Sequence, residues 1–232
     1  MDYRDYQEGM PQKHFWLRAK LDFINVLLNK VNFDKTTKIL DIGVGIGQDL
    51  EVINKFGCVY AIDIDKKTLD LVPEHMVFEK ILADATNIPY PDNFFDMVVS
   101  FDVFEHIKDD SKTLSEIYRV LKKDGVLIFT VPAFNFLFSN HDSYLGHYRR
   151  YNKKMIKKLL VNFNCLTNGY WMSTLFLSAA ICKNYKKYSF NIPKFINSLC
   201  YNILSFENWL IKRSIKLPIG LSIYGIYRVK KT

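Results

Sequence analysis

Residues 39–47 read ILDIGVGIG, and this stretch decides the fold. It begins in a short apolar strand, Lys38–Ile42, and glycines follow at positions 43, 45 and 47. Glycine adopts positive φ without a steric penalty and lets the backbone come close to a ligand. The pattern therefore predicts a strand, a tight turn and a ligand-binding loop at the carboxyl end of the strand.

Strands and helices alternate along the chain on both sides of this loop. Apolar runs rich in β-forming residues predict further strands at 58–62, 77–82, 95–101 and 125–131. Apolar residues at helical spacing predict helices at 14–31, 48–55, 66–71 and 111–122. Because strand–helix alternation of this kind is typical of parallel sheets, we expect a parallel sheet covered by helices.

Beyond Pro132 the alternation weakens. Segment 135–151 is long, aromatic and polar, and it precedes an expected helix at 152–160, for which Asn152 is a suitable N-cap. Two further strands are expected at 164–172 and 221–229. Between them, apolar residues recur at helical spacing, which predicts an inserted helical cap; these residues are Ile196, Leu199, Ile203, Phe206 and Leu210.

The charges are distributed unevenly. The net charge is +8, yet residues 151–232 carry 14 Lys and Arg and a single acid, Glu207, whereas residues 1–150 carry 18 Lys and Arg and 23 Asp and Glu. The basic last third suits an anionic partner, which could be a phosphate-bearing substrate, an acidic membrane surface or nucleic acid. The alternative is that these lysines serve solubility alone.

The cysteines and the chain start favour a cytoplasmic protein. Cys58, Cys165, Cys182 and Cys200 form no CxxC pair, which favours buried small hydrophobic side chains in a reducing compartment over a disulfide or metal role. No apolar run follows a basic N-terminus, and no stretch reaches the roughly 18 apolar residues of a membrane-spanning helix.

Three side chains near the glycine loop narrow the class of ligand. Gln48 stands where a dinucleotide-binding GxGxxG pattern has its third glycine. Asp41 places a carboxylate before the loop, which repels a pyrophosphate but suits S-adenosylmethionine, whose ammonium and sulfonium groups are cationic. Asp63, at the end of the next strand, is placed to accept hydrogen bonds from both ribose hydroxyls of an adenosine group. The alternatives are that the glycines only form the turn and that Asp63 only caps the next helix.

Three further motifs give the chain a resemblance to the class I S-adenosylmethionine-dependent methyltransferases, in the branch that acts on small molecules and glycans. Ala83-Asp84-Ala85 follows the third expected strand, and the fourth reads FDMVVS from Phe95. Glu105-His106 is followed by IYRVLKKDG at 117–125, with Lys123-Asp124 where the family usually has Pro-Gly. The resemblance covers residues 36–132.

The resemblance implies a fold and a cofactor. The fold is α/β and three-layered, with a Rossmann-like, seven-stranded, mainly parallel sheet, an antiparallel last strand and the helical insertion near the C-terminus. The cofactor is S-adenosylmethionine; Asp84 would accept from the adenine amine and the Ala85 amide would donate to the ring, unless Asp84 is only a turn residue. The implied cofactor-binding residues are Asp41, Gly43, Val44, Gly45, Gly47, Asp63, Ile64, Asp84, Ala85 and Phe101.

We expect one methyltransferase domain over residues 1–232. Its parts are an N-terminal helix region (1–35), a cofactor-binding core (36–132), a substrate loop with the sixth strand (133–172), the helical cap (173–216) and the last strand (217–232). The length, with 49% hydrophobic and 24% charged residues, suits one globular domain of this kind.

Candidate acceptor-site residues follow the fourth and fifth strands. His106, His141 and His147 are candidate bases, because histidine titrates near neutrality and an oxygen acceptor must lose its proton. Tyr144, Tyr148, Arg149 and Arg150 suit a carboxylate, a phosphate or a sugar. The alternative for the segment 139–151 is a polar loop that pins the cap through salt bridges. His141, Asp142 and His147 do not have a diagnostic metal spacing, so we expect no metal site.

The leading functional hypothesis is O-methylation of a small molecule or of a sugar-linked or lipid-linked acceptor that is itself anionic. RNA or other nucleic-acid methylation is disfavoured, because SFDVFEH stands at 100–106 where base N-methyltransferases usually carry (N/D)PP(Y/F). A non-catalytic cofactor-binding protein and a nicotinamide oxidoreductase are weaker alternatives. The apolar faces of the cap are bordered by lysines, which fits peripheral membrane contact, a lid over the substrate or a dimer face; the oligomeric state stays open.

Overall fold

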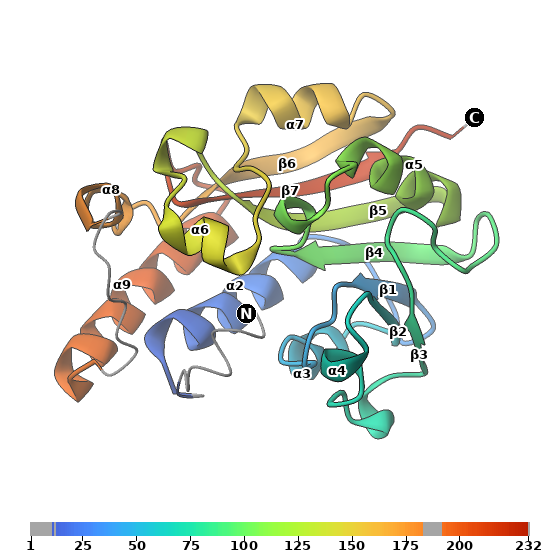
Figure 1. The fold of residues 1–232 in the computed structure, drawn as a ribbon, viewed down its shortest axis with the longest axis horizontal. Helices are drawn as coiled ribbons and strands as arrows, with labels where there is room; N and C mark the ends of the chain where they lie inside the picture. Colours follow the sequence, from blue (N-terminus) through green and yellow to red (C-terminus); the bar gives the residue numbers. More distant parts are fainter. Residues whose placement is uncertain (1–10, 12, 183–191, 232) are drawn as a thin grey trace.

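A seven-stranded sheet in the order β3-β2-β1-β4-β5-β7-β6 organises the computed structural model, which describes residues 11, 13–182 and 192–231 (Figure 1). All neighbouring strands run parallel except β7, which is antiparallel to both β5 and β6. This confirms the predicted fold class, including the antiparallel last strand. The strands are β1 (Lys38–Ile42), β2 (Cys58–Asp63), β3 (Glu79–Leu82), β4 (Phe95–Phe101), β5 (Leu121–Pro132), β6 (Phe163–Trp171) and β7 (Ser222–Val229).

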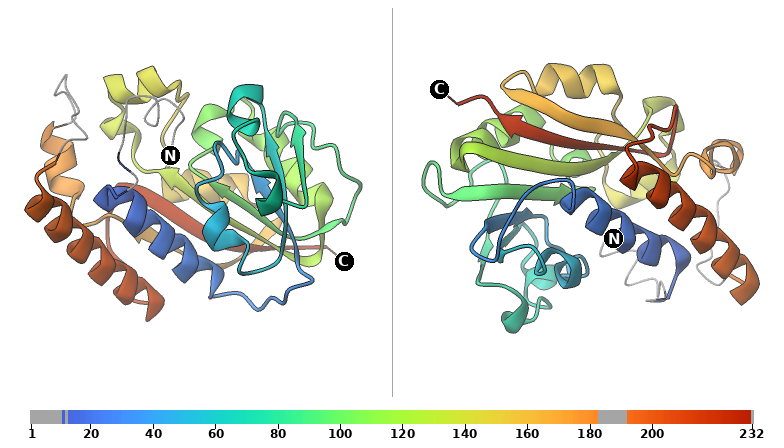
Figure 2. Two further views of the ribbon diagram at one scale, coloured as in Figure 1. Left: turned by 90° about the horizontal axis from the view of Figure 1, so that it is seen from below. Right: turned by 180° about the vertical axis from the view of Figure 1, so that it is seen from behind.

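Helices cover both faces of the sheet, as Figure 2 shows. One face carries α2 (Phe15–Leu28), α3 (Leu50–Ile53) and α9 (Lys194–Lys212), and the other carries α5 (Asp110–Val120) and α7 (Lys153–Leu159). The short helix α4 (Lys66–Leu69) follows β2, and 3-10 turns occur at η1 (Glu74–Met76), η2 (Phe104–His106) and η3 (Asn135–Leu137). Asn152 caps α7 through the amide of Met155, as the sequence predicts.

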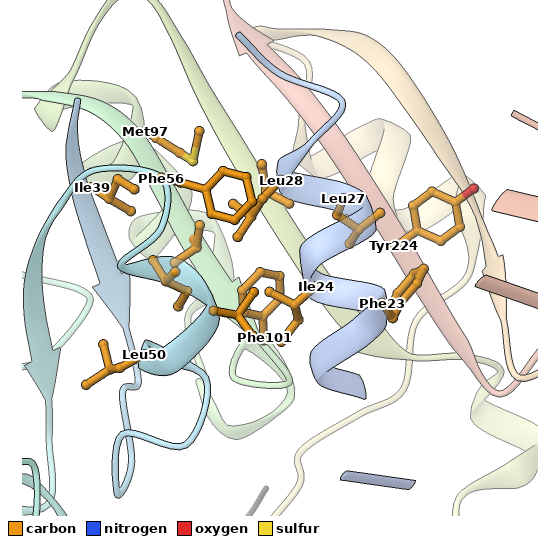
Figure 3. Close-up of a cluster of buried hydrophobic side chains, with 14 of the residues drawn as sticks. Phe23, Ile24, Leu27, Leu28, Ile39, Leu50, Phe56, Met97, Phe101 and Tyr224 are labelled. Carbon is orange, nitrogen blue, oxygen red and sulfur yellow. The ribbon is translucent and has the colours of Figure 1, made fainter. Parts of the chain in front are cut away.

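The N-terminal helix α2 anchors the core beneath the glycine loop. Phe23, Ile24, Leu27 and Leu28 are buried together with apolar side chains of β1, α3 and β4 (Figure 3). Each fully buried side chain of this size contributes about 1.5–3 kcal/mol. The same core therefore fixes α2 against the carboxyl half of the central strands, where the site lies.

Two expectations about local structure are wrong. The helix expected at 111–122 ends at Val120, because Leu121 already pairs with Phe95 of β4 at the start of β5. Segment 135–151, for which the sequence predicts no helix, contains η3 and the helix α6 (Asn140–Leu145). Sheet pairing overrides helical periodicity in the first case. In the second, α6 is held by side-chain contacts of Asp142, which periodicity does not reveal.

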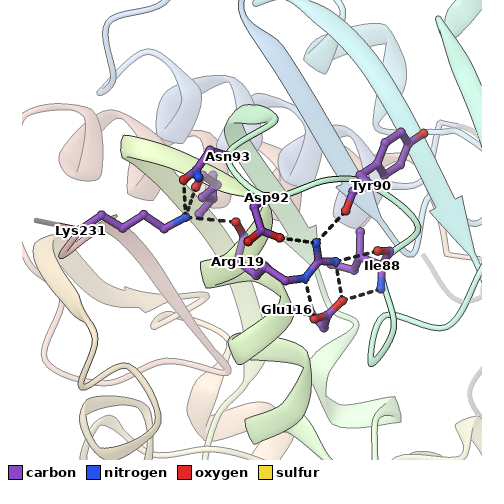
Figure 4. Close-up of polar contacts among 8 residues, drawn as sticks. Ile88, Tyr90, Asp92, Asn93, Glu116, Arg119 and Lys231 are labelled. Atoms are coloured by element: carbon purple, nitrogen blue, oxygen red, sulfur yellow. Dashed lines mark hydrogen bonds and ion pairs between the residues drawn. The ribbon is translucent and has the colours of Figure 1, made fainter.

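Arg119 of α5 braces the segment that leads from β3 to β4 (Figure 4). Its guanidinium donates to the carbonyl oxygens of Ile88 and Tyr90 and pairs with Glu116 and Asp92. Because this segment contains no helix, these contacts supply its fixed geometry. They hold in place the loop that begins with Asp84.

The helical insertion between β6 and β7 consists of α8 (Phe176–Cys182) and α9. Asn208 of α9 donates to the carbonyl of Ala19 on α2 and accepts from the Trp171 indole. Glu207 accepts from the amides of Ser173 and Thr174. The single acid of the last third is thus buried in a structural role. Residues 183–191 of the cap and residues 1–10 and 12 of the N-terminal region lie outside the described residues.

Two further expectations concern a membrane-spanning helix and the cysteines. No helix among the described residues is long and apolar enough to cross a membrane. The expectation of buried cysteines is wrong for Cys165, which is exposed, and Cys58 and Cys200 are only half-buried. Cys165 and Cys58 lie near strand ends, where side chains reach the rim of the core.

Candidate cofactor and acceptor site

The glycine loop lies at the carboxyl ends of β1 and β4, where the strand order reverses direction. Gly43, Gly45 and Gly47 all have positive φ, at +73°, +54° and +80°. The amide of Gly43 donates to the Ile62 carbonyl at the end of β2. Ligands of open α/β sheets bind at such a switch point, outside the carboxyl ends of the strands.

Gly43 permits a close approach between two loops. A Cβ at this position would lie 2.6 Å from a methyl carbon of Val103, in the loop that follows β4. Because no side chain fits there, the backbone of the glycine loop packs directly against the β4 loop. The narrow gap shapes one wall of a cavity.

Asp63 ties the end of β2 to the glycine loop. One carboxylate oxygen accepts from the Gly45 amide at 2.8 Å, and the other accepts from the Asp65 amide at 2.9 Å. Each carboxylate oxygen has a second lone pair, so Asp63 retains the capacity to accept from two ribose hydroxyls. Asp65, and not Asp63, caps α4.

A cavity of about 620 Å³ opens between the glycine loop, β2 and the β3–β4 segment; we call it the cofactor cavity. Asp84 lies on its wall and accepts from the Thr86 amide at 2.7 Å, so it also forms a turn. The predicted cofactor residues that line this cavity are Gly43, Gly45, Asp63, Ile64, Asp84 and Ala85. Val44 and Phe101 line a second cavity instead, while Asp41 and Gly47 line neither.

Buried charges lie beneath the loop. Lys20 of α2 is 1% exposed and pairs with Asp102 at 3.0 Å and with Asp49 at 3.6 Å. Burial by itself lowers the pKa of Lys20, but the carboxylates of Asp102 and Asp49 outweigh it and raise that pKa. Burial raises the pKa of Asp41 well above its usual value, and the negative charges of Asp49 and Asp63 raise it further.

The sequence did not reveal Lys20 or Asp102 as part of the site. The positive charge of Lys20 partly neutralises Asp49 and Asp102. The net negative charge beneath the loop is therefore smaller than the acidic residues alone would give. The sequence does contain an indication that Lys20 is buried, because Lys20 lies between Leu17 and Ile24 on the apolar face of the expected helix. Asp102 directly follows β4 and has φ +60°, a conformation that few non-glycine residues adopt.

The second cavity, of about 590 Å³, lies between α2, the β4 and β5 ends, α6 and α8; we call it the acceptor cavity. Its walls are mainly apolar, with Trp16, Leu137, Met172 and Leu175 among them. Gly43, Asp102 and His106 line both cavities. The two cavities therefore meet at the end of β4.

The acceptor cavity has one polar end. Glu105, His106 and His147 lie close together there and Arg150 joins His147 through Asp142, while His141 also lines the cavity, so the structure brings all three candidate bases to one cavity. Glu105 is buried, and burial, with the nearby negative charge of Asp102, raises the pKa of its carboxyl well above the usual value. The rings of His106 and His147 contact edge to face, with centroids 4.5 Å apart.

Asp142 of α6 organises this polar end. It accepts from both the backbone amide and the hydroxyl of Ser139, from His147 Nδ1 at 2.9 Å, and from two nitrogens of Arg150. Burial disfavours its charge, but the bonds from His147, Arg150 and Ser139 outweigh burial and hold the pKa of Asp142 well below its usual range. With His147 and Arg150 already bound to its carboxylate, Asp142 fixes side chains rather than contacting a ligand.

The four predicted substrate-binding residues take different positions. Arg150 lines the acceptor cavity, and Tyr148 lines the cofactor cavity. Tyr144 and Arg149 line neither, and Arg149 pairs with Asp110 at 2.6 Å. The segment therefore pairs with the start of α5, which differs from the expected pinning of the cap, and it also lines both cavities.

Comparisons with known proteins agree with this arrangement. Residues 40–129 match the family described as a methyltransferase domain. The chain is 37% identical over 112 residues to a ubiquinone/menaquinone biosynthesis C-methyltransferase of Neisseria meningitidis, covering 44% of this chain and 45% of that protein. It is 36% identical over 108 residues to phosphoethanolamine N-methyltransferase 2 of Caenorhabditis elegans, covering 43% of this chain and 25% of that one. The matches thus span less than half of either relative.

A solved structure shows the same fold. Phosphoethanolamine N-methyltransferase 2 of Haemonchus contortus, in complex with S-adenosyl-L-methionine, superposes with a TM-score of 0.59 at 20% identity, covering 90% of this chain and 52% of that one. That protein, by its printed title, binds S-adenosyl-L-methionine in this fold. Gly43, which has no room for a side chain, and the acidic Asp63 fit the same molecule here.

Replacing Gly43 with alanine tests the close approach. Gly43→Ala is expected to weaken S-adenosylmethionine binding at least about tenfold, or ~1.4 kcal/mol, because the new Cβ pushes Val103 into the cofactor cavity. Isothermal titration calorimetry measures the effect. Gly146→Ala is the matched control, since Gly146 also has positive φ (+84°) but has nothing within 4 Å of the added Cβ. Equal affinity in the Gly43→Ala variant would contradict the packing argument, and Val103→Ala added to it should restore binding.

The raised pKa of Asp41 predicts a pH dependence of cofactor affinity. A cationic ligand favours ionised Asp41, so affinity should rise as pH increases through this pKa, by about tenfold for a partly shielded charge pair. Asp41→Asn should remove most of this rise, which is expected above the pH range in which an ordinary aspartate titrates. The exposed Asp70→Asn serves as the control, and a pH profile that the Asp41→Asn variant shares with the parent would refute the role.

Proposed function

We propose that this chain, whose residues 40–129 match a methyltransferase domain, is a class I S-adenosylmethionine-dependent methyltransferase that transfers the cofactor's methyl group to a hydroxyl of an amphipathic small molecule or a sugar-linked or lipid-linked acceptor. The observation that carries the proposal is the meeting of the two cavities at Gly43, Asp102 and His106. A methyl donor bound in the cofactor cavity would meet an acceptor bound in the acceptor cavity at this junction. In-line displacement requires that alignment.

The residues of the cofactor cavity would bind and orient the cofactor, which supplies an activated methyl group when bound. Asp63 would accept from the ribose hydroxyls while its bonds to Gly45 and Asp65 hold it in place. Asp84 and Ala85 would contact the adenine, and the exposed side chain of Ile64 would cover it. The ionised carboxylates beneath the loop would attract the cationic end of the molecule.

The acceptor cavity fits an apolar molecule with one polar end. Its apolar walls would contact the apolar part of the acceptor, while His106 and His147 lie beside the junction with the cofactor cavity and Arg150 lines the same cavity. His147 is oriented by Asp142, so its Nε2 is a fixed candidate for removing the proton of an acceptor hydroxyl. Arg150 would supply positive charge for an anionic group. Besides Arg150, Tyr148 is a candidate for contact with the acceptor, and it lines the cofactor cavity.

Several features favour this acceptor class over nucleic acid. A nucleic acid needs an open, basic groove, whereas the acceptor cavity is lined by apolar residues from α2, α6 and α8. The two relatives named above methylate small molecules by their printed names, one on carbon and one on nitrogen. An oxygen acceptor is proposed here because the polar end holds imidazoles suited to proton removal.

Labelled methyl transfer into fractionated cell extract tests the proposal. With radiolabelled S-adenosylmethionine, label is expected in the lipid or small-molecule fraction, and Asp63→Ala should lower the transfer at least tenfold, whereas the exposed Asp70→Ala should not. Label in RNA would overturn the acceptor class. Cofactor binding without transfer into any fraction would favour a non-catalytic protein.

Peripheral membrane contact through α9 is part of the proposal. Phe195, Leu199, Phe206 and Trp209 recur at helical spacing and are all exposed, Phe195 to 77%. Arg213 stacks on Trp209, and the only acid of the last third, Glu207, is buried. An apolar stripe beside unbalanced cations suits an anionic lipid surface. The neighbouring α8 lines the acceptor cavity with Ser178 and Ala179, so such contact would bring the cavity to the lipid.

Vesicle sedimentation tests this contact. The protein is expected to co-sediment with vesicles that contain an anionic phospholipid and not with pure phosphatidylcholine at the same salt concentration. Phe195→Glu combined with Phe206→Glu should abolish sedimentation. Phe78→Glu should leave sedimentation unchanged, because Phe78 is an exposed aromatic residue directly before β3, at the edge of the sheet opposite to β6. Sedimentation unchanged by the α9 substitutions would refute the assignment of this face.

A further inference from the structure

Three potential metal ligands gather at the polar end of the acceptor cavity. Glu105 and His106 belong to η2, directly after β4, and His147 follows α6. One ligand atom from each lies within 4.8 Å of the other two. We propose that Glu105, His106 and His147 form a binding site for a divalent transition-metal cation. The sequence expectation of no metal site considered a different set, His141, Asp142 and His147.

Glu105 supplies the first argument. Its side chain is 1% exposed, and its Oε2 has no hydrogen-bond partner among the described residues. Buried carboxylate oxygens in folded proteins are almost always satisfied, so an orphaned one calls for an explanation. Asp102, a second carboxylate, lines the same part of the cavity. A cation between these groups would satisfy the orphaned oxygen and offset the concentration of negative charge.

His147 supplies the second argument. Its Nδ1 lies 2.9 Å from Asp142 Oδ1, which leaves Nε2 as the nitrogen that can bind a metal. A carboxylate that accepts from one ring nitrogen of a histidine, while the other nitrogen binds the metal, is the usual second layer of such sites. Asp142 is itself fixed by Ser139 and Arg150. The imidazole is therefore held in the orientation that a ligand needs before any metal arrives.

The ligand chemistry selects the class of cation. Two imidazoles and one carboxylate suit Zn²⁺, Co²⁺, Mn²⁺ or Fe²⁺ better than Mg²⁺ or Ca²⁺, which prefer oxygen ligands. Three protein ligands leave coordination positions open, as in metal sites that act on a substrate. His106 also lines the cofactor cavity, so the open positions lie where the two cavities meet.

The location gives the cation a role that rests on the proposed methyl transfer. An acceptor hydroxyl that occupies an open position would lose its proton more readily, because a bound cation stabilises the oxygen anion. The proton leaves to solvent, the methyl carbon forms a bond to the acceptor oxygen as its bond to sulfur breaks, and the sulfur keeps the electron pair. In this arrangement His106 and His147 act on the acceptor through the cation instead of taking the proton themselves.

Cobalt titration of the untagged, chelator-treated protein tests the site. One Co²⁺ per chain is expected, with visible absorption bands of a site that contains nitrogen ligands. Glu105→Gln and His147→Gln should each weaken Co²⁺ binding at least tenfold, and Asp142→Asn should weaken it about 10–100-fold. His141→Gln is the matched control, because His141 lines the same cavity but is outside the cluster. Circular dichroism of each variant verifies folding.

The outcomes separate this inference from the proposed function. Co²⁺ binding that is absent in the parent, or equal in the parent and both ligand variants, would overturn the metal site, whatever the methyl-transfer assay shows. Co²⁺ binding that depends on Glu105 and His147, in a protein that methylates no extract fraction, would support the site and reject the proposed function. Full transfer by metal-free protein would overturn the cation's role in activating the acceptor. Glu105→Gln should still bind S-adenosylmethionine, since Glu105 lies outside the cofactor cavity.

Discussion

The contact between the backbone at Gly43 and the side chain of Val103 is the constraint on which the site depends. It brings the loop after β1 within van der Waals distance of the loop after β4, and only a residue without a side chain allows this. The same contact sets where the two cavities meet, because Gly43 lines both. Asp63 stabilises the arrangement from β2 by accepting from the Gly45 amide. The fold thus fixes the junction through backbone contacts, and side chains then give each cavity its chemistry.

The charged groups beneath the glycine loop differ from those at the acceptor cavity in how they are paired. Beneath the glycine loop, the buried Lys20 pairs with Asp49 and Asp102, whose side chains are partly exposed and line the acceptor cavity. At the acceptor end, Asp142 is ionised by its donors and orients His147, while Glu105 is buried with an unsatisfied oxygen. The first group forms ion pairs within the protein, while Lys20 Nζ and one oxygen of Asp49 make no hydrogen bond among the described residues. The other retains capacity for a ligand, which is the property expected of a reacting centre.

Local patterns predicted the glycine loop, Asp63 and the central strands, because a strand–turn–helix unit is defined by residues close in sequence. Lys20 was not predicted, since its position on an apolar helix face becomes meaningful only when Asp102 lies opposite it. The gathering of Glu105 and His106 with His147 depends on how the chain after β5 returns to the β4 loop, through bonds such as that from the Tyr148 amide to the Glu105 carbonyl. The division of the chain into regions at 35, 132, 172 and 216 stays a prediction.

The most direct measurement is calorimetry of the parent and the Asp63→Ala variant with three ligands: S-adenosylmethionine, its demethylated product and NAD. The geometry of the loop and of Asp63 predicts that the first two bind the parent at one molecule per chain, that NAD does not, and that Asp63→Ala weakens both by at least about tenfold. NAD binding as tight as that of S-adenosylmethionine would contradict the assignment of the cofactor cavity. So would an Asp63→Ala variant that binds S-adenosylmethionine as well as the parent does.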